Sequence, residues 1–128
     1  MKFEEYRKQD ATALAALIRK KEVSATELLD LAIARTEAVN GPINAVVLKL
    51  YEDARKAALA PLPEGPFSGV PFLIKDLDVQ MKGTKYTGGT RLLKDFVSTE
   101  SSEVVNRIQR SGLVIFGKTN TPEFGLTL

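Results

Sequence analysis

Three short apolar runs constrain the fold of this chain more than any other feature. They cover residues 45–50, 70–74 and 113–116, and each is rich in β-branched or aromatic side chains. A short helix is expected over 51–60, and another helix ends at Gly112 before the third run. Strands that alternate with helices are typical of an α/β domain with a largely parallel sheet. We therefore predict an α/β fold in which N-terminal helices precede part of a mostly parallel or mixed sheet flanked by helices.

Two helices are expected before the first strand. Asp10 can cap a helix over about 11–21, and Ser24 with Glu27 has the spacing of a capping box. Val23 and Leu28 have the spacing of a hydrophobic staple around that second start. The second helix is expected to stop at Asn40-Gly41-Pro42. Residues 1–42 thus form a helical region, and 43–128 begin the α/β core.

Composition excludes several classes of enzyme and partner. The 128 residues suffice for one domain, and they contain no cysteine and no histidine. Thiol nucleophiles, disulfides, Ser-His-Asp triads and imidazole zinc sites are therefore excluded from this stretch. A net charge of +2 without a basic stripe argues against a nucleic-acid partner. Without an apolar run suited to a signal peptide or a membrane span, we predict a cytoplasmic protein with no membrane contact.

A lysine follows each of the second and third apolar runs, directly after the second and one residue later after the third. Right-handed crossovers would place the carboxyl ends of both strands on one edge of the sheet, where open α/β sheets bind ligands. Lys75 and Lys118 are therefore both expected at that edge. A lysine that loses its charge through burial becomes a competent general base. Spacing alone favours a plainer role for Lys75, in which it reaches solvent or pairs with Asp76 or Asp78.

Residues 112–119, Gly-Leu-Val-Ile-Phe-Gly-Lys-Thr, match the P-loop pattern at every fixed position. A P-loop needs a flexible loop between a strand and a helix, so that backbone N–H groups can surround a phosphate. Here the four variable positions are themselves the strongest strand in the chain, and Pro122 follows closely. We therefore favour a helix-turn-strand unit over a nucleotide site.

Three polar pairs have a structural interpretation. Asp76 and Asp78 point the same way on an extended chain but have no evident third ligand, so they are interpreted as strand-end or turn residues rather than a metal site. Gly88-Gly89 favours a tight turn over an anion-binding nest. Ser101-Ser102 stands where a helix cap belongs, and Ser101 or Thr99 is expected to cap the helix that ends at Gly112.

Four segments stand in a specific order: Gly69-Val-Pro-Phe-Leu-Ile-Lys75-Asp76, the Gly/Thr-rich stretch through Gly88-Gly89-Thr90, the helix ending at Gly112, and Gly117-Lys-Thr-Asn120-Thr-Pro-Glu-Phe124-Gly. Together they resemble the front part of enzymes of the amidase signature family. The helix that starts at Ser24 and the following Ile43-Asn44-Ala45 are also similar to that family's N-terminal region. By this resemblance, residues 1–128 form the N-terminal part of a single amidase domain.

The resemblance implies hydrolysis of a carboxylic amide by a Ser–cis-Ser–Lys triad that uses no histidine. Lys75 matches the catalytic lysine, and Phe124, Gly125 and Leu126 match a turn near the substrate. Asn120 is expected to hold the backbone after the third strand. The apolar Phe124–Leu128 segment favours a substrate with an apolar acyl group. The family needs neither a metal nor an organic cofactor. A small-molecule amide and a homodimeric assembly are the implied partners.

The chain departs from the family pattern because both triad serines belong to a Gly/Ser-rich segment that the family places well beyond the lysine motif. We therefore expect an N-terminal fragment that is inactive alone and needs the remainder of the amidase chain or a complementing chain. Three alternatives stay open. They are the ammonia-supplying subunit of a tRNA-dependent glutamine amidotransferase, a P-loop-like nucleotide binder and a non-catalytic interaction module.

Overall fold

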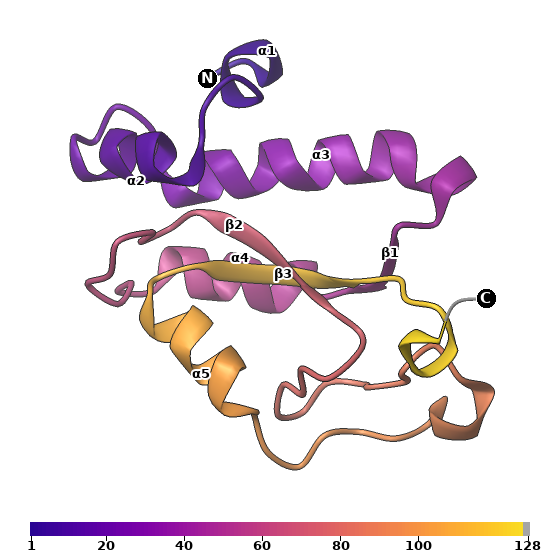
Figure 1. The fold of residues 1–128 in the computed structure, drawn as a ribbon. Helices are drawn as coiled ribbons and strands as arrows, with labels where there is room; N and C mark the ends of the chain where they lie inside the picture. Colours follow the sequence, from indigo (N-terminus) through magenta and orange to yellow (C-terminus); the bar gives the residue numbers. More distant parts are fainter. Residues whose placement is uncertain (127–128) are drawn as a thin grey trace.

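A computed structural model describes residues 1–126 as helices around a small mixed sheet (Figure 1). An α/β fold with N-terminal helices before a flanked sheet is therefore confirmed. In chain order, the elements are α1 (Phe3–Tyr6), α2 (Ala11–Arg19), α3 (Ala25–Ile43), β1 (Val46–Lys49), α4 (Tyr51–Leu59), β2 (Pro71–Lys75), the 3-10 turn η1 (Arg91–Leu93), α5 (Glu103–Arg110), β3 (Val114–Thr119) and the 3-10 turn η2 (Glu123–Gly125).

The sheet has the strand order β1-β3-β2, so the last strand in sequence lies in the middle. β2 and β3 run parallel, as expected for strands joined through the helix α5, whereas β1 pairs antiparallel with β3. Gly117 in β3 faces Leu73 of β2 and Lys49 of β1. A Cβ atom at Gly117 would lie 2.7 Å from the Leu48 carbonyl oxygen, so the close approach of β1 requires glycine there.

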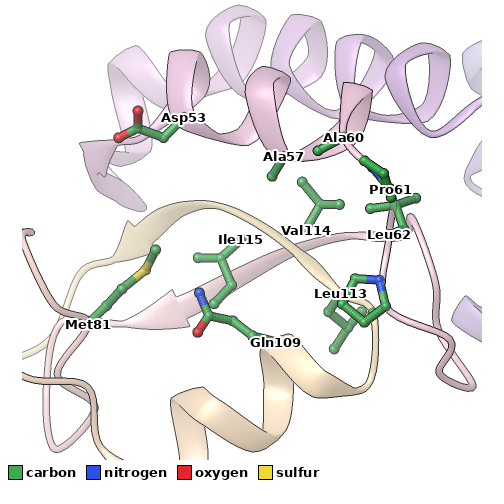
Figure 2. A pocket seen from close by; sticks show the side chains of 12 residues that line it. Asp53, Ala57, Ala60, Pro61, Leu62, Met81, Gln109, Leu113, Val114 and Ile115 are labelled. Carbon is green, nitrogen blue, oxygen red and sulfur yellow. The ribbon is translucent and has the colours of Figure 1, made fainter.

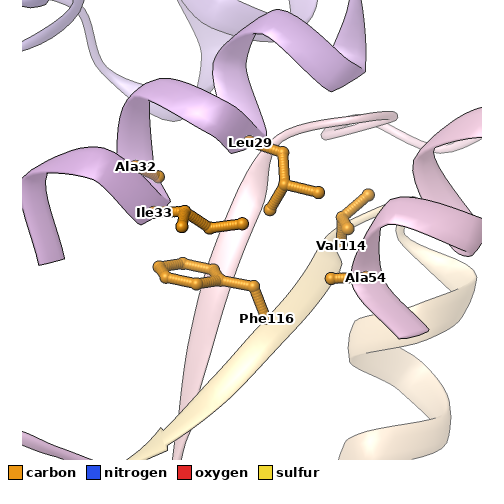
Figure 3. Close-up of a cluster of buried hydrophobic side chains, with 6 residues drawn as sticks. All are labelled: Leu29, Ala32, Ile33, Ala54, Val114 and Phe116. Carbon is orange, nitrogen blue, oxygen red and sulfur yellow. The ribbon is translucent and has the colours of Figure 1, made fainter. Parts of the chain in front are cut away.

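Apolar side chains cover both faces of the sheet. α3 and α4 pack on one face, where Leu29, Ile33 and Ala54 meet Val114 and Phe116 of β3 (Figure 3). On the other face, Val105 of α5 packs against Ile74 of β2 and Ile115 of β3. Successive β3 residues thus enter opposite clusters, as the alternation of side chains along a strand requires.

The N-terminal helices begin at the predicted caps. The Asp10 carboxylate accepts a hydrogen bond from the Ala13 N–H at 2.8 Å. The Ser24 hydroxyl accepts from the Glu27 N–H at 3.1 Å, and the Glu27 carboxylate accepts from the Ser24 N–H at 2.9 Å. This reciprocal pair confirms the capping box.

Helix α3 does not stop at Asn40-Gly41-Pro42, so that prediction is wrong. The helix continues to Ile43 and ends at Asn44, whose φ of 47° is left-handed. Pro42 stands in the last turn, and the Asn40 side chain passes beyond the helix to bond both backbone groups of Val46, at 2.8 and 2.9 Å. These side-chain bonds tie the helix end to β1, so tertiary contacts outweigh the helix-breaking tendency of the tripeptide.

Two further boundaries differ from the sequence prediction. β3 does not end before Gly117-Lys118 but continues to Thr119, because these residues pair with strands on both sides. Helix α5 begins after Ser102, and no side-chain hydrogen bond caps it. Instead, the Ser101 hydroxyl accepts from the Lys82 N–H at 2.9 Å, and Ser102 donates to the Gln80 carbonyl at 3.3 Å. Both serines therefore fasten the loop after β2.

No helix within residues 1–126 is long and apolar enough to cross a membrane.

Leu28 and Leu92 form a matched pair for testing the packing of α3. Leu28 is fully buried beside Val23 and Val70, whereas Leu92 is 82% exposed. We expect Leu28→Ala to lower the free energy of unfolding by about 3 kcal/mol and Leu92→Ala to change it by less than about 0.5 kcal/mol. Urea unfolding followed by circular dichroism measures both values, and equal unfolding midpoints for the two variants would contradict the packing described.

Removal of the Ser24 cap is expected to lower the free energy of unfolding by about 1 kcal/mol in Ser24→Ala. Hydrogen bonds from the Ser24 backbone and hydroxyl hold the pKa of Glu27 below its ordinary value. A group with a lowered folded-state pKa stabilises the fold above its unfolded pKa, and this contribution disappears as the pH falls through the folded value. Ser24→Ala keeps the backbone N–H and removes only the hydroxyl bond to Glu27, so the difference between the parent chain and the variant should shrink in acid by the hydroxyl part alone. A constant difference from pH 7 to pH values below the folded pKa of Glu27 would argue against the bond from the Ser24 hydroxyl to the Glu27 carboxylate.

Candidate active site

The carboxyl ends of β2 and β3 lie side by side, because Ile74 pairs with Lys118 and Lys75 pairs with Thr119. Both predicted lysines therefore reach the same edge of the sheet, yet their environments are opposite. The Lys75 side chain is exposed, whereas Lys118 is fully buried. The two lysines share an edge of the sheet, as predicted, but differ in burial.

Asp76 is buried and bonds the loop that follows β2. Its carboxylate accepts from the Thr87 N–H at 3.2 Å and from the Thr87 hydroxyl at 2.5 Å. Its own N–H donates to the Thr119 carbonyl and its carbonyl accepts from the Gly88 N–H, both at 3.0 Å. Asp76 is therefore a strand-end residue, as expected, but one that connects β2, β3 and the loop around Thr87.

Lys118 is the buried cation of this edge. Its Nζ donates to the Lys85 carbonyl oxygen at 2.5 Å and lies 4.0 Å from Asp76 Oδ1 and 5.9 Å from the centre of the Tyr86 ring. Burial lowers the pKa of Lys118, and the nearby Asp76 carboxylate opposes this effect. Sequence reasoning missed this role, because it interpreted Lys118 as lying beyond the end of its strand.

The P-loop match at 112–119 does not correspond to a phosphate-binding loop. Six of these residues form the strand β3, and the lysine at the pattern's key position is buried against the Lys85 carbonyl. Backbone groups that pair with β1 and β2 cannot surround a phosphate. The P-loop-like nucleotide binder is therefore excluded for this segment, and the helix-turn-strand interpretation is confirmed.

The turn around Phe124 packs against the same edge. The Phe124 N–H donates to the Gly88 carbonyl at 2.7 Å, so two backbone hydrogen bonds link this turn through Gly88 to Asp76. A Cβ atom at Gly125 would lie 2.7 Å from the Leu77 side chain, and its φ of 74° also favours glycine. Phe124 and Leu126 are 50% and 78% exposed. The Phe124, Gly125 and Leu126 turn is therefore linked through Gly88 to Asp76, the residue after Lys75, and its two apolar side chains are exposed. Residues 127–128 of the predicted apolar segment lie outside the described residues.

Asn120 has the expected backbone role. Its amide donates to the Asn44 carbonyl at 3.1 Å, and its side-chain oxygen accepts from the Thr121 N–H at 2.8 Å. Gly88 and Gly89 adopt φ values of 58° and 70° in the turn between Thr87 and Thr90, where the Thr90 N–H donates to the Thr87 carbonyl at 3.0 Å. The predicted tight turn is therefore present, and it is held by Asp76 and Phe124.

A separate apolar cavity of about 260 Å³ lies between α4, the beginning of β3 and α5 (Figure 2). Ala57, Leu113, Val114 and Ile115 are among its lining residues, and Lys75 is not.

Residues 1–126 contain no group of three or more acidic side chains that could hold a metal ion. The candidate site therefore consists of the exposed lysine, the buried pair behind it and the Phe124 turn.

Comparison with known proteins identifies the family. The family model described as amidase matches residues 27–128. The chain is 45% identical to the 6-aminohexanoate-cyclic-dimer hydrolase of Paenarthrobacter ureafaciens, over 91% of this chain and 24% of that protein. It is also 37% identical to a glutamyl-tRNA(Gln) amidotransferase subunit of Lachnospira eligens, over 91% of this chain and 25% of that protein.

A solved structure supports the same assignment. The structure of a 6-aminohexanoate cyclic dimer hydrolase complexed with substrate superimposes with a TM-score of 0.82 at 45% identity, covering 91% of this chain and 24% of that one. The chain thus spans about a quarter of the length of the relatives it matches. Because the family model matches most of its residues, the chain belongs to the amidase family.

Proposed function

We propose that this chain contributes the catalytic lysine of an enzyme that hydrolyses a carboxylic amide at its C–N bond. The observation that carries the proposal is the exposed position of Lys75 at the end of β2, within a chain of the amidase family. A relative named as a 6-aminohexanoate-cyclic-dimer hydrolase supports amide hydrolysis as the reaction class. The products are an acid and either ammonia or an amine.

In the proposed reaction Lys75 is a base that acts on a serine and does not itself contact the substrate. The neutral amine accepts a proton from a bridging serine, which in turn deprotonates a nucleophilic serine. The nucleophile attacks the amide carbon, and backbone N–H groups of a glycine- and serine-rich loop stabilise the oxyanion. The nitrogen leaves as ammonia or an amine after it gains a proton, and water then cleaves the acyl-enzyme ester to the acid.

Both serines come from outside the 128 residues in this proposal. Ser101 and Ser102 lack the surrounding glycines, and their hydroxyls bond the Lys82 N–H and the Gln80 carbonyl. The partner is therefore further amidase sequence, in the same polypeptide or in a complementing chain. A lysine is a base only as the neutral amine, which a water-excluded site favours, so the partner also has to cover the exposed Lys75.

The substrate in this proposal is a small amide whose acyl part contacts the turn of Phe124, Gly125 and Leu126. The two apolar side chains of this turn are exposed beside the lysine edge, which favours an apolar acyl group. A homodimer, a cytoplasmic location and chemistry without a metal or cofactor stay predictions from the sequence.

An ammonia-supplying component of a glutamine amidotransferase is the second candidate, because the Lachnospira eligens relative is named as part of such an enzyme. Such a protein would release ammonia from glutamine and depend on partner chains. We call these 128 residues together with the further amidase sequence, in the same polypeptide or as a complementing chain, the complete amidase. We expect the complete amidase to hydrolyse 6-aminohexanoate cyclic dimer or p-nitroacetanilide without amidotransferase partner chains. Ammonia release from glutamine alone, with no turnover of either amide, would instead favour the amidotransferase.

The purified 128-residue chain is expected to show no amide hydrolysis above the buffer rate, because the proposal places its nucleophile elsewhere. Amine release from the same two amides measures turnover, and a fluorophosphonate probe tests for an activated serine. Turnover by the 128 residues that disappears in Lys75→Ala would contradict this expectation.

In the complete amidase, Lys75→Ala is expected to lower kcat by about a hundred- to ten-thousandfold, the range typical of a lost proton-transfer group. Lys56→Ala is the matched control, because that side chain is 76% exposed on α4 and forms only a surface ion pair with Asp53. The control should keep the parental kcat and KM. An unchanged kcat in Lys75→Ala would favour a non-catalytic interaction module.

A further inference from the structure

Lys118 has the largest fully buried side chain in the described part of the chain. Burial of an amine is unfavourable unless polar partners surround it. The Lys85 carbonyl at 2.5 Å, the Asp76 carboxylate at 4.0 Å and the Tyr86 ring at 5.9 Å supply these partners. The side chain therefore holds the beginning of the 85–89 loop against β3.

Asp76 holds the other part of the same loop. Its carboxylate accepts both the N–H and the hydroxyl of Thr87, and Thr87 Oγ1 in turn accepts from the Gly89 N–H at 3.1 Å. The Asp76 carbonyl accepts from the Gly88 N–H at 3.0 Å. Thr87 and Gly88 therefore bond Asp76 directly, and Gly89 bonds it through Thr87 Oγ1.

Lys75 immediately precedes this anchor. Lys75 is the last residue of β2 and is exposed, whereas the next residue, Asp76, is buried. The Asp76 N–H also bonds the Thr119 carbonyl at 3.0 Å, next to Lys118 in β3. The backbone directly after Lys75 is therefore held both by β3 and by the 85–89 loop.

We propose that Lys118, Asp76 and Thr87 form a positioning unit that fixes the backbone at Lys75 and the 85–89 loop for catalysis. The inference rests on the proposed function through the role given to Lys75. The three residues do not touch the substrate in this proposal. They act through Lys75 and through the Phe124 turn, which bonds Gly88.

Thr87 offers a matched pair of variants for a test that needs no activity. Thr87→Val keeps the shape but removes the hydroxyl bonded to Asp76, whereas Thr87→Ser keeps it. Amide hydrogen exchange by NMR in the 128-residue chain should become about ten- to hundredfold faster at residues 87–89 in Thr87→Val, as expected for a lost hydrogen bond to a charged group. Thr87→Ser should stay within about threefold of the parent. Amides in α3 should keep their rates in both variants.

Asp76→Asn is the second variant, since it keeps the size of the side chain but removes the charge that faces Lys118. It should also accelerate exchange at residues 87–89 while α3 stays protected. Parental exchange at these residues in both Thr87→Val and Asp76→Asn would overturn the inference. Faster exchange confined to the loop would support it.

Kinetics of the complete amidase test the link to catalysis. Misplacement of a catalytic group by about 1 Å can cost a hundredfold in rate, so Thr87→Val should lower kcat by at least about tenfold. KM should stay within about twofold and Thr87→Ser should restore kcat, since positioning of Lys75 differs from substrate binding. A parental kcat in Thr87→Val, or a raised KM alone, would overturn this inference while an inactive Lys75→Ala still supports the proposed function. Full activity of Lys75→Ala would overturn the proposed function itself.

Discussion

The parallel pairing of β2 with β3 determines where every candidate group lies. Its register sets Ile74 beside Lys118 and Lys75 beside Thr119, so two cations end on one edge of the sheet. At the end of β2, Lys75 is exposed and the next residue, Asp76, is buried. A shift of one residue in this register would move both residues relative to β3 and break the bond from the Asp76 N–H to the Thr119 carbonyl. The apolar contacts of Ile74 and Ile115 with Val105 oppose such a shift.

The buried charge of Lys118 explains why the loop after β2 has a defined shape without an apolar period. Residues 84–90 are mostly glycine, threonine and other polar residues, which supply little apolar surface for packing. Their order comes from polar contacts with Lys118 and Asp76 in a water-poor environment, where each hydrogen bond is stronger than in water. The loop in turn positions the Phe124 turn through Gly88.

Local features of the sequence predicted the elements well, and contacts made outside the element concerned explain the errors. The caps at Asp10 and Ser24 depend on side chains within three residues, so their spacing sufficed. The continuation of α3 through Pro42 depends on the Asn40 contact with Val46. The burial of Lys118 depends on Lys85, 33 residues away, and no local pattern contains that contact. The catalytic role predicted for Lys75 rests on the family motif, because an exposed lysine at a strand end has no distinctive spacing.

The two lysines differ in whether their amines are accessible for the proton transfer that we propose. Lys118 donates to a carbonyl, lies near a carboxylate and has no exposed surface, so a substrate or a serine could not reach its amine. Lys75 projects from the same edge into open space, where a covering segment can approach it. A general base has to lie within hydrogen-bond reach of the proton that it removes. Access therefore supports Lys75 as the reacting amine of the proposed reaction, and burial supports the proposed role of Lys118 in holding the backbone behind it.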